Sequence, residues 1–483
     1  MQKIFSKINL FFQKTENVYL VIVLVFGLFM AVFNPPFTGV PDEQDHYWKA
    51  WSIANGYFWC TGNNVIPKSA ENLPKRIEPV KIEGINGKKI ALRKIYDALI
   101  AEDSNKTKVI SGAFCTAMPF GYLPQALGLN IGRIFHFSPL LDFYLARLFN
   151  LLLVIAITFW AIRIIPFGKI ILLLIGLLPM TVQQIASLSY DGLHISLIFL
   201  FLAYILKLAA EKEVGIGKKE MIFLFLLSLI GFNIKPGYFV LSLLVFLLPI
   251  NKFRNKKTYW FFVIFFVSVN IIIFLIIQNL FRNGISAKEG IDVQHQMLNV
   301  IHDPLNFIYI AMQTFYKKII FFIETFIFKP GWLNDSLSYV FYLFAIFGLI
   351  ILIKNEEEKV NLTNCQRWIL LGTFLACFFV VFLSLYAIWT KVGAEVVSGV
   401  QGRYFLSIFP ILVLSFYKSK FNFLFQIIKN NRNLAIIVFL IILFIFSFQK
   451  IYQIHYDKNK NSKSSLRKVQ LVGEISSGIN KSF

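Results

Sequence analysis

Carboxylate and histidine side chains gather in residues 41–51, directly after the first apolar stretch of the chain. A helix has 3.6 residues per turn, so one that begins near Pro41 places Asp42, Asp45 and His46 on a single face. Glu43 stands beside them. Carboxylates and imidazoles close to a membrane surface can act as a general base or as metal ligands. This segment is therefore the first candidate for chemistry.

The same segment also allows a purely structural interpretation. Its other face carries Tyr47, Trp48 and Trp51, and aromatic rings suit the headgroup region of a bilayer. The segment is therefore expected to be an interfacial helix of the first outer loop. In the structural interpretation Asp42 and Glu43 complement the positive end of its dipole, and the tryptophans form an aromatic belt. The residues alone leave both interpretations open.

Ionisable residues within the apolar stretches form a second candidate group. Asp191 and His194 occupy a tight turn, where Asp191 is either functional or the N-cap of the next helix. Lys235 and Arg403 lie in hairpins that are too short to cross the roughly 30 Å of hydrocarbon. They are expected to lie within the outer leaflet, where a cation lining a cavity binds phosphate; the alternative is snorkelling at a helix end. Arg147 allows the same two interpretations.

Composition decides the class of protein that must position these residues. Of 483 residues, 57% are hydrophobic and only 15% are charged. A soluble domain carries roughly 25% charged residues, so soluble enzymes and nucleic-acid binders are excluded. The net charge of +22 is spread through short loops, as retention of Lys and Arg on the cytoplasmic side predicts. The sequence therefore predicts an all-α, polytopic membrane protein.

A helix that spans the bilayer needs about 20 residues, and the chain offers about eleven apolar stretches. The alternation of Lys and Arg between loops predicts a cytoplasmic N-terminus and two long outer segments, 34–118 and 282–335. We divide the chain into a cytoplasmic N-terminus (1–17), one transmembrane domain (18–448) and a polar tail (449–483), which an odd span count puts outside. The expected spans are 18–33, 140–162, 170–188, 192–207, 220–234, 237–250, 258–281, 336–353, 367–389, 404–417 and 433–448.

Cysteines and cofactor motifs are sparse. Cys60 and Cys115 share the first outer segment and either form a disulfide or remain two free thiols. No nucleotide-binding loop, nucleophile elbow or zinc motif occurs, so no cofactor is predicted with certainty. A divalent metal held by Asp42, Glu43 and His46 stays open, and nothing in the sequence indicates an oligomeric state.

Several short motifs follow one another along the chain. They are Asn34-Pro35-Pro36, Pro41-Asp42-Glu43 with His46 and Gly56, Tyr122-Leu123-Pro124-Gln125-Ala126, Tyr144-Leu145-Ala146-Arg147, Ser187-Leu188-Ser189-Tyr190-Asp191, Lys235-Pro236 and Gly399-Val400-Gln401-Gly402-Arg403-Tyr404-Phe405. In this order they resemble a bacterial multi-pass family known as domain of unknown function 2142, from about residue 20 to about residue 415. The resemblance departs at Gln44 and Asp45, where small residues or proline are expected, and at Tyr190, where proline is commoner.

That family is in turn similar to the GT-C membrane glycosyltransferases. The resemblance implies a GT-C-like fold in a bacterial cell membrane. It also implies transfer of a sugar, with inversion, from a polyprenyl-phosphate donor to a glycan acceptor on the outer face. A polysaccharide polymerase or ligase that uses a lipid-linked oligosaccharide, and a lipid or sugar flippase, are the alternatives.

The resemblance also implies roles for the candidate residues. Asp42 is the expected base, with Glu43 as its alternate, and His46 orients the acceptor. The donor phosphate is expected to contact Lys235, Arg403, Tyr404 and Arg147, while Asp191 and His194 supply further polar groups in the cavity.

Overall fold

The computed structural model describes residues 11–59, 64–81, 88–101, 107–110, 118–211, 215–235, 237–281, 290–354, 356, 362–417 and 432–457. These residues are mostly helical and include six helices that are long and apolar enough to cross a membrane. At 1.5 Å per residue, the longest of them extend roughly 39 Å. The chain is therefore a multi-pass membrane protein. The six helices are α2 (Thr15–Phe33), α7 (Pro139–Ile164), α10 (Asp191–Ala210), α12 (Lys256–Phe281), α17 (Asn364–Trp389) and α20 (Arg432–His455).

Three of the eleven expected spans are not continuous α-helices. Residues 170–188 form α8 (Lys169–Gly176) and α9 (Pro179–Ile185), because proline disfavours helical backbone in the residue before it. Residues 237–250 form a 3₁₀ helix, η3 (Tyr238–Leu247), and then η4 (Ile250–Lys252). Residues 404–417 include η6 (Gly402–Phe405) and α18 (Phe409–Ser415). Two of these three, 237–250 and 404–417, belong to the hairpins that the sequence predicts to be too short to cross the bilayer. Two further helices, α11 (Lys218–Gly231) and α16 (Tyr339–Lys354), are short.

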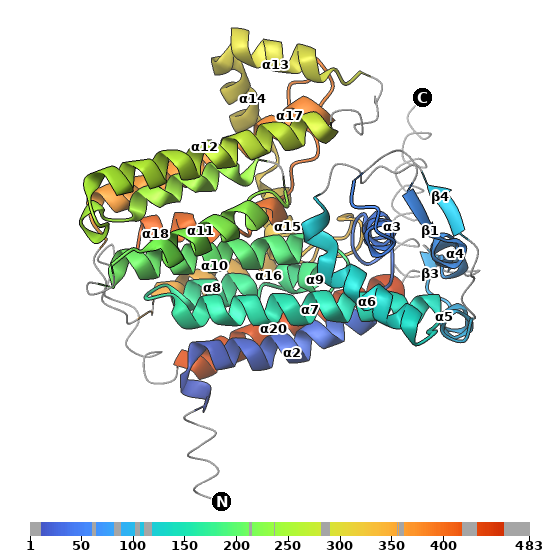
Figure 1. The fold of residues 1–483 in the computed structure, drawn as a ribbon. Helices are drawn as coiled ribbons and strands as arrows, with labels where there is room; N and C mark the ends of the chain where they lie inside the picture. Colours follow the sequence, from blue (N-terminus) through green and yellow to red (C-terminus); the bar gives the residue numbers. More distant parts are fainter. Residues whose placement is uncertain are drawn as a thin grey trace, which may run out of the picture.

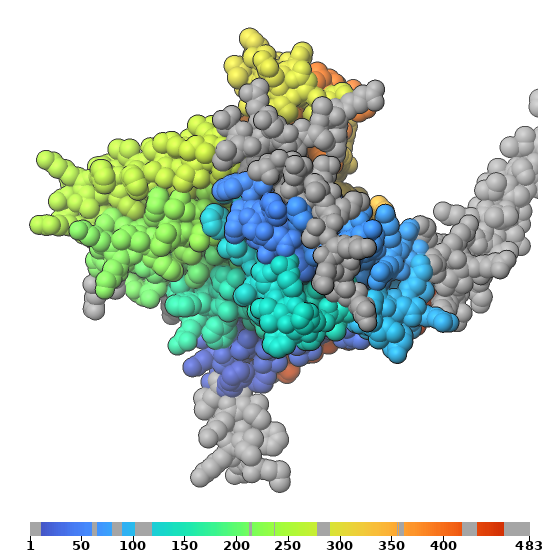
Figure 2. Space-filling model, turned by 45° about the vertical axis from the view of Figure 1, so that its right-hand side comes forward, coloured from blue at the N-terminus to red at the C-terminus, as the bar shows by residue number. Residues whose placement is uncertain are grey.

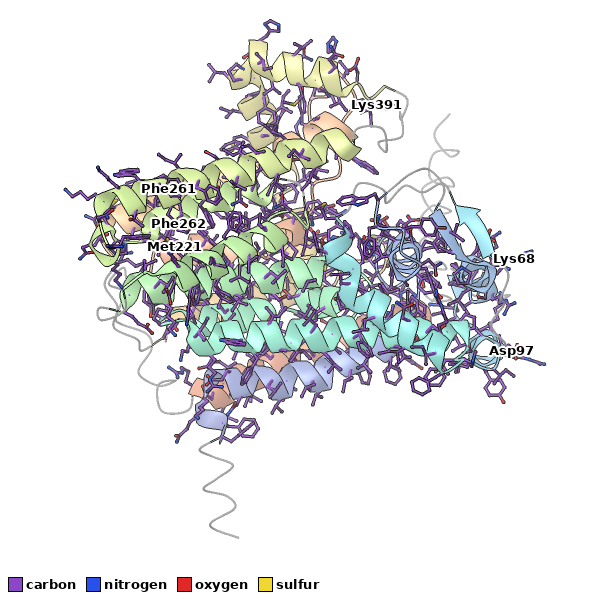
Figure 3. The ribbon with its side chains drawn as sticks, in the orientation of Figure 1. Lys68, Asp97, Met221, Phe261, Phe262 and Lys391 are labelled. Atoms are coloured by element: carbon purple, nitrogen blue, oxygen red, sulfur yellow. The ribbon has the colours of Figure 1, made fainter. Side chains whose placement is uncertain are left out.

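The long helices lie side by side, and the elements of the first long loop gather at one end of them (Figure 1). Lys68 and Asp97 mark this end in Figure 3, whereas Met221, Phe261 and Phe262 mark the opposite end. Two antiparallel strand pairs, β1 with β4 and β2 with β3, belong to the loop. Its elements are α3 (Glu43–Ala54), β1 (Asn64–Pro67), α4 (Lys68–Arg76), β2 (Val80–Lys81), β3 (Lys88–Lys89), α5 (Leu92–Leu99), β4 (Thr107–Ile110), η2 (Pro119–Tyr122) and α6 (Leu123–Ile134).

The first and last long helices run parallel. Phe26 stacks on Phe444 with ring centroids 4.0 Å apart, and the Tyr456 hydroxyl donates to the Phe33 carbonyl at 2.9 Å. Both α2 and α20 therefore end on the side that carries the first loop. Lys89 reinforces this arrangement, because its ammonium donates to two carbonyls at the end of α20. The chain enters α2 and leaves α20 at opposite ends of the bundle, which agrees with an odd number of crossings.

The core is centred on α10, of which 78% of the most apolar window is buried. Around it pack α7, α9, α11 and η3. A second, smaller cluster lies under the first loop, where Tyr47 and Trp51 of α3 are buried against residues of α6 and α7. These two rings therefore face the protein interior, in contrast to the headgroup position that the sequence suggested for them.

Candidate functional site

The acidic segment begins at a residue with unusual backbone geometry. Asp42 precedes the first residue of α3 and adopts the left-handed conformation, with φ 62° and ψ 13°. Aspartate is one of the few residues other than glycine that enter this region. Asp42 occupies the N-cap position of α3, but its half-buried side chain makes no capping hydrogen bond. The carboxylate stays available for other contacts.

Asp45 lies one turn further along the same helix. Burial, reinforced by the like charge of Asp42, raises the pKa of Asp45 to about 6. Asp45 therefore holds a proton in mildly acidic conditions. Sequence analysis put Asp45 on this face but gave it no role.

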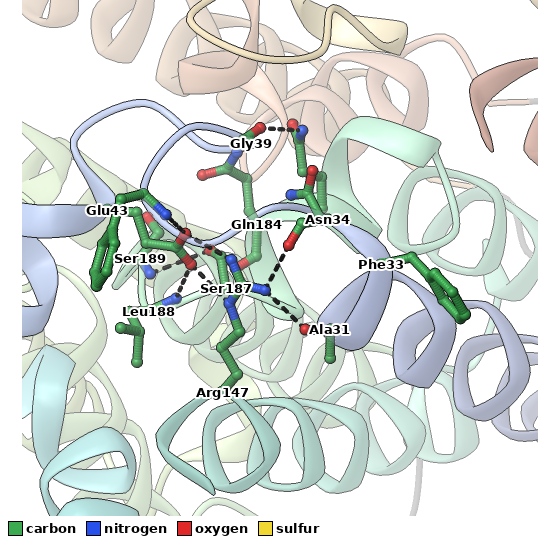
Figure 4. Close-up of polar contacts among 12 residues, drawn as sticks. Ala31, Phe33, Asn34, Gly39, Glu43, Arg147, Gln184, Ser187, Leu188 and Ser189 are labelled. Carbon is green, nitrogen blue, oxygen red and sulfur yellow. Dashed lines mark hydrogen bonds and ion pairs between the residues drawn. The ribbon is translucent and has the colours of Figure 1, made fainter. Parts of the chain in front are cut away.

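Glu43 and Arg147 form an ion pair in which both side chains have 0% exposure (Figure 4). Arg147 Nη2 lies 2.6 Å from Glu43 Oε2, and Arg147 Nε lies 2.9 Å from Glu43 Oε1. The backbone amides of Phe37 and Leu188 also donate to this carboxylate, at 3.1 and 3.2 Å. Four donors therefore surround Glu43, which is a buried structural acceptor at this position.

The remaining nitrogen of Arg147 fastens the end of the first span. Its Nη1 donates to the carbonyls of Ala31 and Asn34, at 2.7 and 2.8 Å. The Glu43–Arg147 pair therefore connects four parts of the fold: the end of α2, the start of α3, α7 and the loop before α10. The geometry favours a positioning role for Glu43 and Arg147, whereas sequence analysis expected an alternate base and a phosphate ligand.

His46 is also buried, at the boundary between the acidic segment and the bundle. Its Nδ1 lies 2.7 Å from the Tyr122 hydroxyl, and its ring stands edge-on to Tyr190 with centroids 5.3 Å apart. Burial lowers the pKa of His46 to about 3, so the imidazole is neutral at pH 7. A neutral imidazole bonded to a phenol is suited to orienting a hydroxyl.

One carboxylate lies between two cations at the bundle end below α3. Lys235 Nζ is 2.9 Å from Asp191 Oδ1, and Arg403 Nη1 is 4.0 Å from Asp191 Oδ2. Asp191 is the first residue of α10, and its side chain engages Lys235 instead of capping its own helix. The Lys235 ammonium also lies 3.9 Å from the centre of the Tyr404 ring. From the sequence these residues were expected to line one cavity, and the fold brings Asp191, Lys235, Arg403 and Tyr404 together.

Arg403 is held in place by two glutamines. Gln401 accepts from its Nε at 2.6 Å, and Gln184 accepts from its Nη1 at 3.0 Å. Gln184 is fully buried in α9 and was missed by sequence analysis. A signal was available, because Gln183 and Gln184 are adjacent amides inside an otherwise apolar stretch.

Beneath these charges, His194 makes two structural contacts. Its Nδ1 lies 3.0 Å from the Gly231 carbonyl and its Nε2 lies 3.2 Å from the Ser407 hydroxyl. Its ring packs on Tyr238, whose hydroxyl donates to the Tyr404 carbonyl at 2.5 Å. His194 therefore supports the backbone that carries Tyr404.

Tyr190 joins the two parts of the site. The His46 ring packs against the Tyr190 ring in a T-shaped arrangement, and the Lys235 ammonium lies 5.9 Å from the centre of the Tyr190 ring. Asp42 is close enough to Arg403 and Tyr404 to act on both groups electrostatically. Asp42, at the start of α3, thus lies within electrostatic range of Arg403, one of the two cations that flank Asp191.

Two further observations concern other ligands and cysteines. Within the described ranges, no group of three or more His, Cys, Asp or Glu side chains could hold a metal ion. Cys60 and Cys115, for which the sequence leaves a disulfide and two free thiols open, lie outside the described residues.

A buried ion pair between Glu324 and Lys329, 2.5 Å apart, was not predicted from the sequence. It lies at the end of α15 (Ile319–Ile327), which packs on η6.

Together, the fold and the site define a mostly helical, multi-pass membrane protein with a charged cluster at one end of its bundle. The chain belongs to the family described as predicted membrane protein (DUF2142), which matches residues 24–412. The match confirms the resemblance to that family and includes all the candidate residues from Asp42 to Tyr404. No curated protein matches the chain.

Proposed function

We propose that the protein is an integral-membrane glycosyltransferase that moves a sugar from a polyprenyl-phosphate donor to a glycan acceptor on the outer face of the cell membrane. The observation that carries this proposal is the pair of cations, Lys235 and Arg403, beside the acidic start of α3. Phosphate binding calls for fixed cations, and activation of a hydroxyl calls for a carboxylate.

The reaction is a single displacement at the anomeric carbon of the sugar. Asp42 accepts the proton of the acceptor hydroxyl as the oxygen forms its bond to that carbon. The bond from carbon to phosphate oxygen breaks, and its electron pair leaves with the lipid phosphate. Lys235 and Arg403 stabilise the developing charge on that phosphate, and the configuration of the sugar inverts.

Charge balance favours a monophosphate donor over a diphosphate. Lys235 and Arg403 contribute two positive charges and Asp191 removes one, so these three groups carry a net charge of +1. A sugar joined to a lipid through one phosphate carries a single negative charge and neutralises them. A lipid diphosphate, the donor of a polymerase or ligase, would leave an excess negative charge in a poorly hydrated site, which is unfavourable.

The test is the glycan composition of the cell envelope. Wild type, a deletion, and deletions complemented with Asp42→Asn or Arg403→Ala are compared at equal membrane levels. The matched controls are Asp97→Asn and Arg163→Ala, which alter exposed residues of the same types. We expect the deletion and both site variants to lack the same single sugar, and both controls to retain it.

Other outcomes would replace the proposal. A change in polymer length instead of a missing sugar would favour a polymerase or ligase. Full restoration by Asp42→Asn would remove the catalytic base and favour lipid transport.

A further inference from the structure

Two helices project from one side of the molecule, α13 (Val293–His302) and α14 (Pro304–Lys317). They form the yellow projection in Figures 1 and 2. One face of α14 packs onto the protein. The buried residues of that face are Phe307, Ile310, Ala311 and Thr314.

The opposite face of α14 is apolar and uncovered. Leu305, Tyr309, Met312 and Tyr316 fall within about 60° of one another around the helix axis. Their exposed fractions are 75%, 63%, 47% and 81%. A contiguous apolar stripe of this size marks a site of interaction with another apolar phase. We call these four residues the α14 stripe.

A polar edge separates the stripe from the packed face. Asn306, Gln313 and Lys317 recur on one side of the helix, at about 80–120° from Leu305. Lys317 lies 3.8 Å from Glu395, an exposed residue of the loop that follows α17. The helix therefore has one edge suited to water and, beside it, a stripe suited to hydrocarbon.

Contacts with α17 show where α13 and α14 lie relative to the membrane. Phe307 packs on Tyr386, in the last turn of α17, with ring centroids 5.5 Å apart. Gln296 of α13 donates to the carbonyls of Thr390 and Lys391, immediately beyond the end of that helix. Because α17 is long enough to span the bilayer, its end marks the membrane surface. The α14 stripe lies at this level.

We propose that α14 is an interfacial helix whose stripe is seated in the lipid headgroup and upper acyl region. The occupant is the bilayer because α14 packs on the end of α17, a helix long enough to span the membrane. Both α17 and α12 expose apolar side chains along their length, among them Ile264, Ile272 and Leu375. Two tyrosines and a flanking lysine are the composition expected of a segment at this depth. A second copy of the chain is the competing occupant, and the experiment below distinguishes it.

The position of α14 at the membrane surface also sets the depth of the charged cluster in the bilayer. Helix α15 follows α14 directly, and the Thr325 hydroxyl accepts from the Gly402 amide at 2.7 Å. Lys318, between the two helices, donates to the Val397 carbonyl at 3.1 Å. The segment that carries Arg403 is thus fastened to a helix that rests on the membrane surface.

Spin-label accessibility in liposomes of neutral phospholipid tests the proposal. Single cysteines replace Leu305, Tyr316 or, as the control, His295, in a full chain whose four natural cysteines are changed to serine or alanine. His295 is exposed on α13 and polar. We expect labels at 305 and 316 to collide with oxygen several-fold more often than with a water-soluble nickel chelate. The label at 295 should show the reverse.

The other results overturn the proposal. Labels at 305 and 316 that are as accessible to nickel as the label at 295 would place the stripe in water. Labels shielded from both reagents would place it against protein, such as a second copy. A photoactivatable phospholipid applied to the unmodified chain gives an independent measurement. We expect its adducts on the peptide containing Tyr309 and Tyr316, and their absence there would refute lipid contact.

Discussion

Removing one partner of the buried Glu43–Arg147 pair should strongly destabilise the protein. The change Glu43→Gln keeps the size of the side chain but replaces a carboxylate oxygen with an amide group that donates. The carboxylate now accepts from two arginine nitrogens and two backbone amides, so the new amide faces donors. Arg147 also becomes an uncompensated buried charge. Loss of one partner of a buried ion pair costs about 3–5 kcal/mol, a large part of the typical free energy of unfolding of about 5–15 kcal/mol.

The free energy of unfolding can be measured by titration with denaturing detergent in mixed micelles. The double change of Glu43→Gln with Arg147→Met should recover much of the loss, because no buried charge remains. We expect a coupling energy of at least about 2 kcal/mol between the two positions. The control is Lys207→Gln, which breaks an exposed pair with Glu211 and should cost no more than about 0.5 kcal/mol. A cost for Glu43→Gln as small as that control would refute the reasoning.

Two further predictions concern pH and packing. The pKa of Asp45 is raised from 3.8 to about 6, so the folded state binds the extra proton and loses stability as pH rises between about 4 and 6. Titration of His46 changes the stability in the opposite direction over this range, so the measurement compares the unfolding temperature of Asp45→Asn with that of wild type at each pH. The variant should become increasingly more stable than wild type as pH rises to about 6, and the difference should then stay constant. A difference that is the same at every pH would contradict the prediction. A Cβ at Gly402 would lie 1.9 Å from the Phe322 carbonyl oxygen, whereas one at Gly372 meets nothing within 4 Å. Gly402→Ala should therefore lower the free energy of unfolding by about 1–3 kcal/mol, and Gly372→Ala should leave it unchanged or slightly raise it; equal effects would rule out the close approach of α15 to η6.

Local patterns were sufficient to predict the class of the protein and the places where charges would matter. Hydrophobicity is a property of each stretch by itself, so residues 18–33 and 140–162 were recognised as helices without knowledge of their neighbours. The same holds for ionisable residues such as Asp191 and Lys235, which stand out against an apolar background. Family membership also follows from ordered short motifs.

Backbone form within apolar stretches was less predictable. Apolar content at 237–250 is compatible with any helix that buries its side chains, and tertiary packing selected a 3₁₀ helix there. Similarly, the aromatic side of α3 was assigned to the membrane surface from its composition. The fold instead covers Tyr47 and Trp51 with α6 and α7, because protein packing offers them the same apolar surroundings as lipid.

The sequence by itself determined that this is a helical membrane protein with acids after its first span and cations in two short hairpins. Only the tertiary structure decided which charges meet. Glu43 and Arg147 are 104 residues apart, and Arg403 meets Gln184 across 219 residues. Pairing at such separations depends on how helices pack, and no local periodicity encodes it. The tertiary structure therefore separates a buried, structural Glu43 from the adjacent, half-buried Asp42, although the two are chemically almost alike.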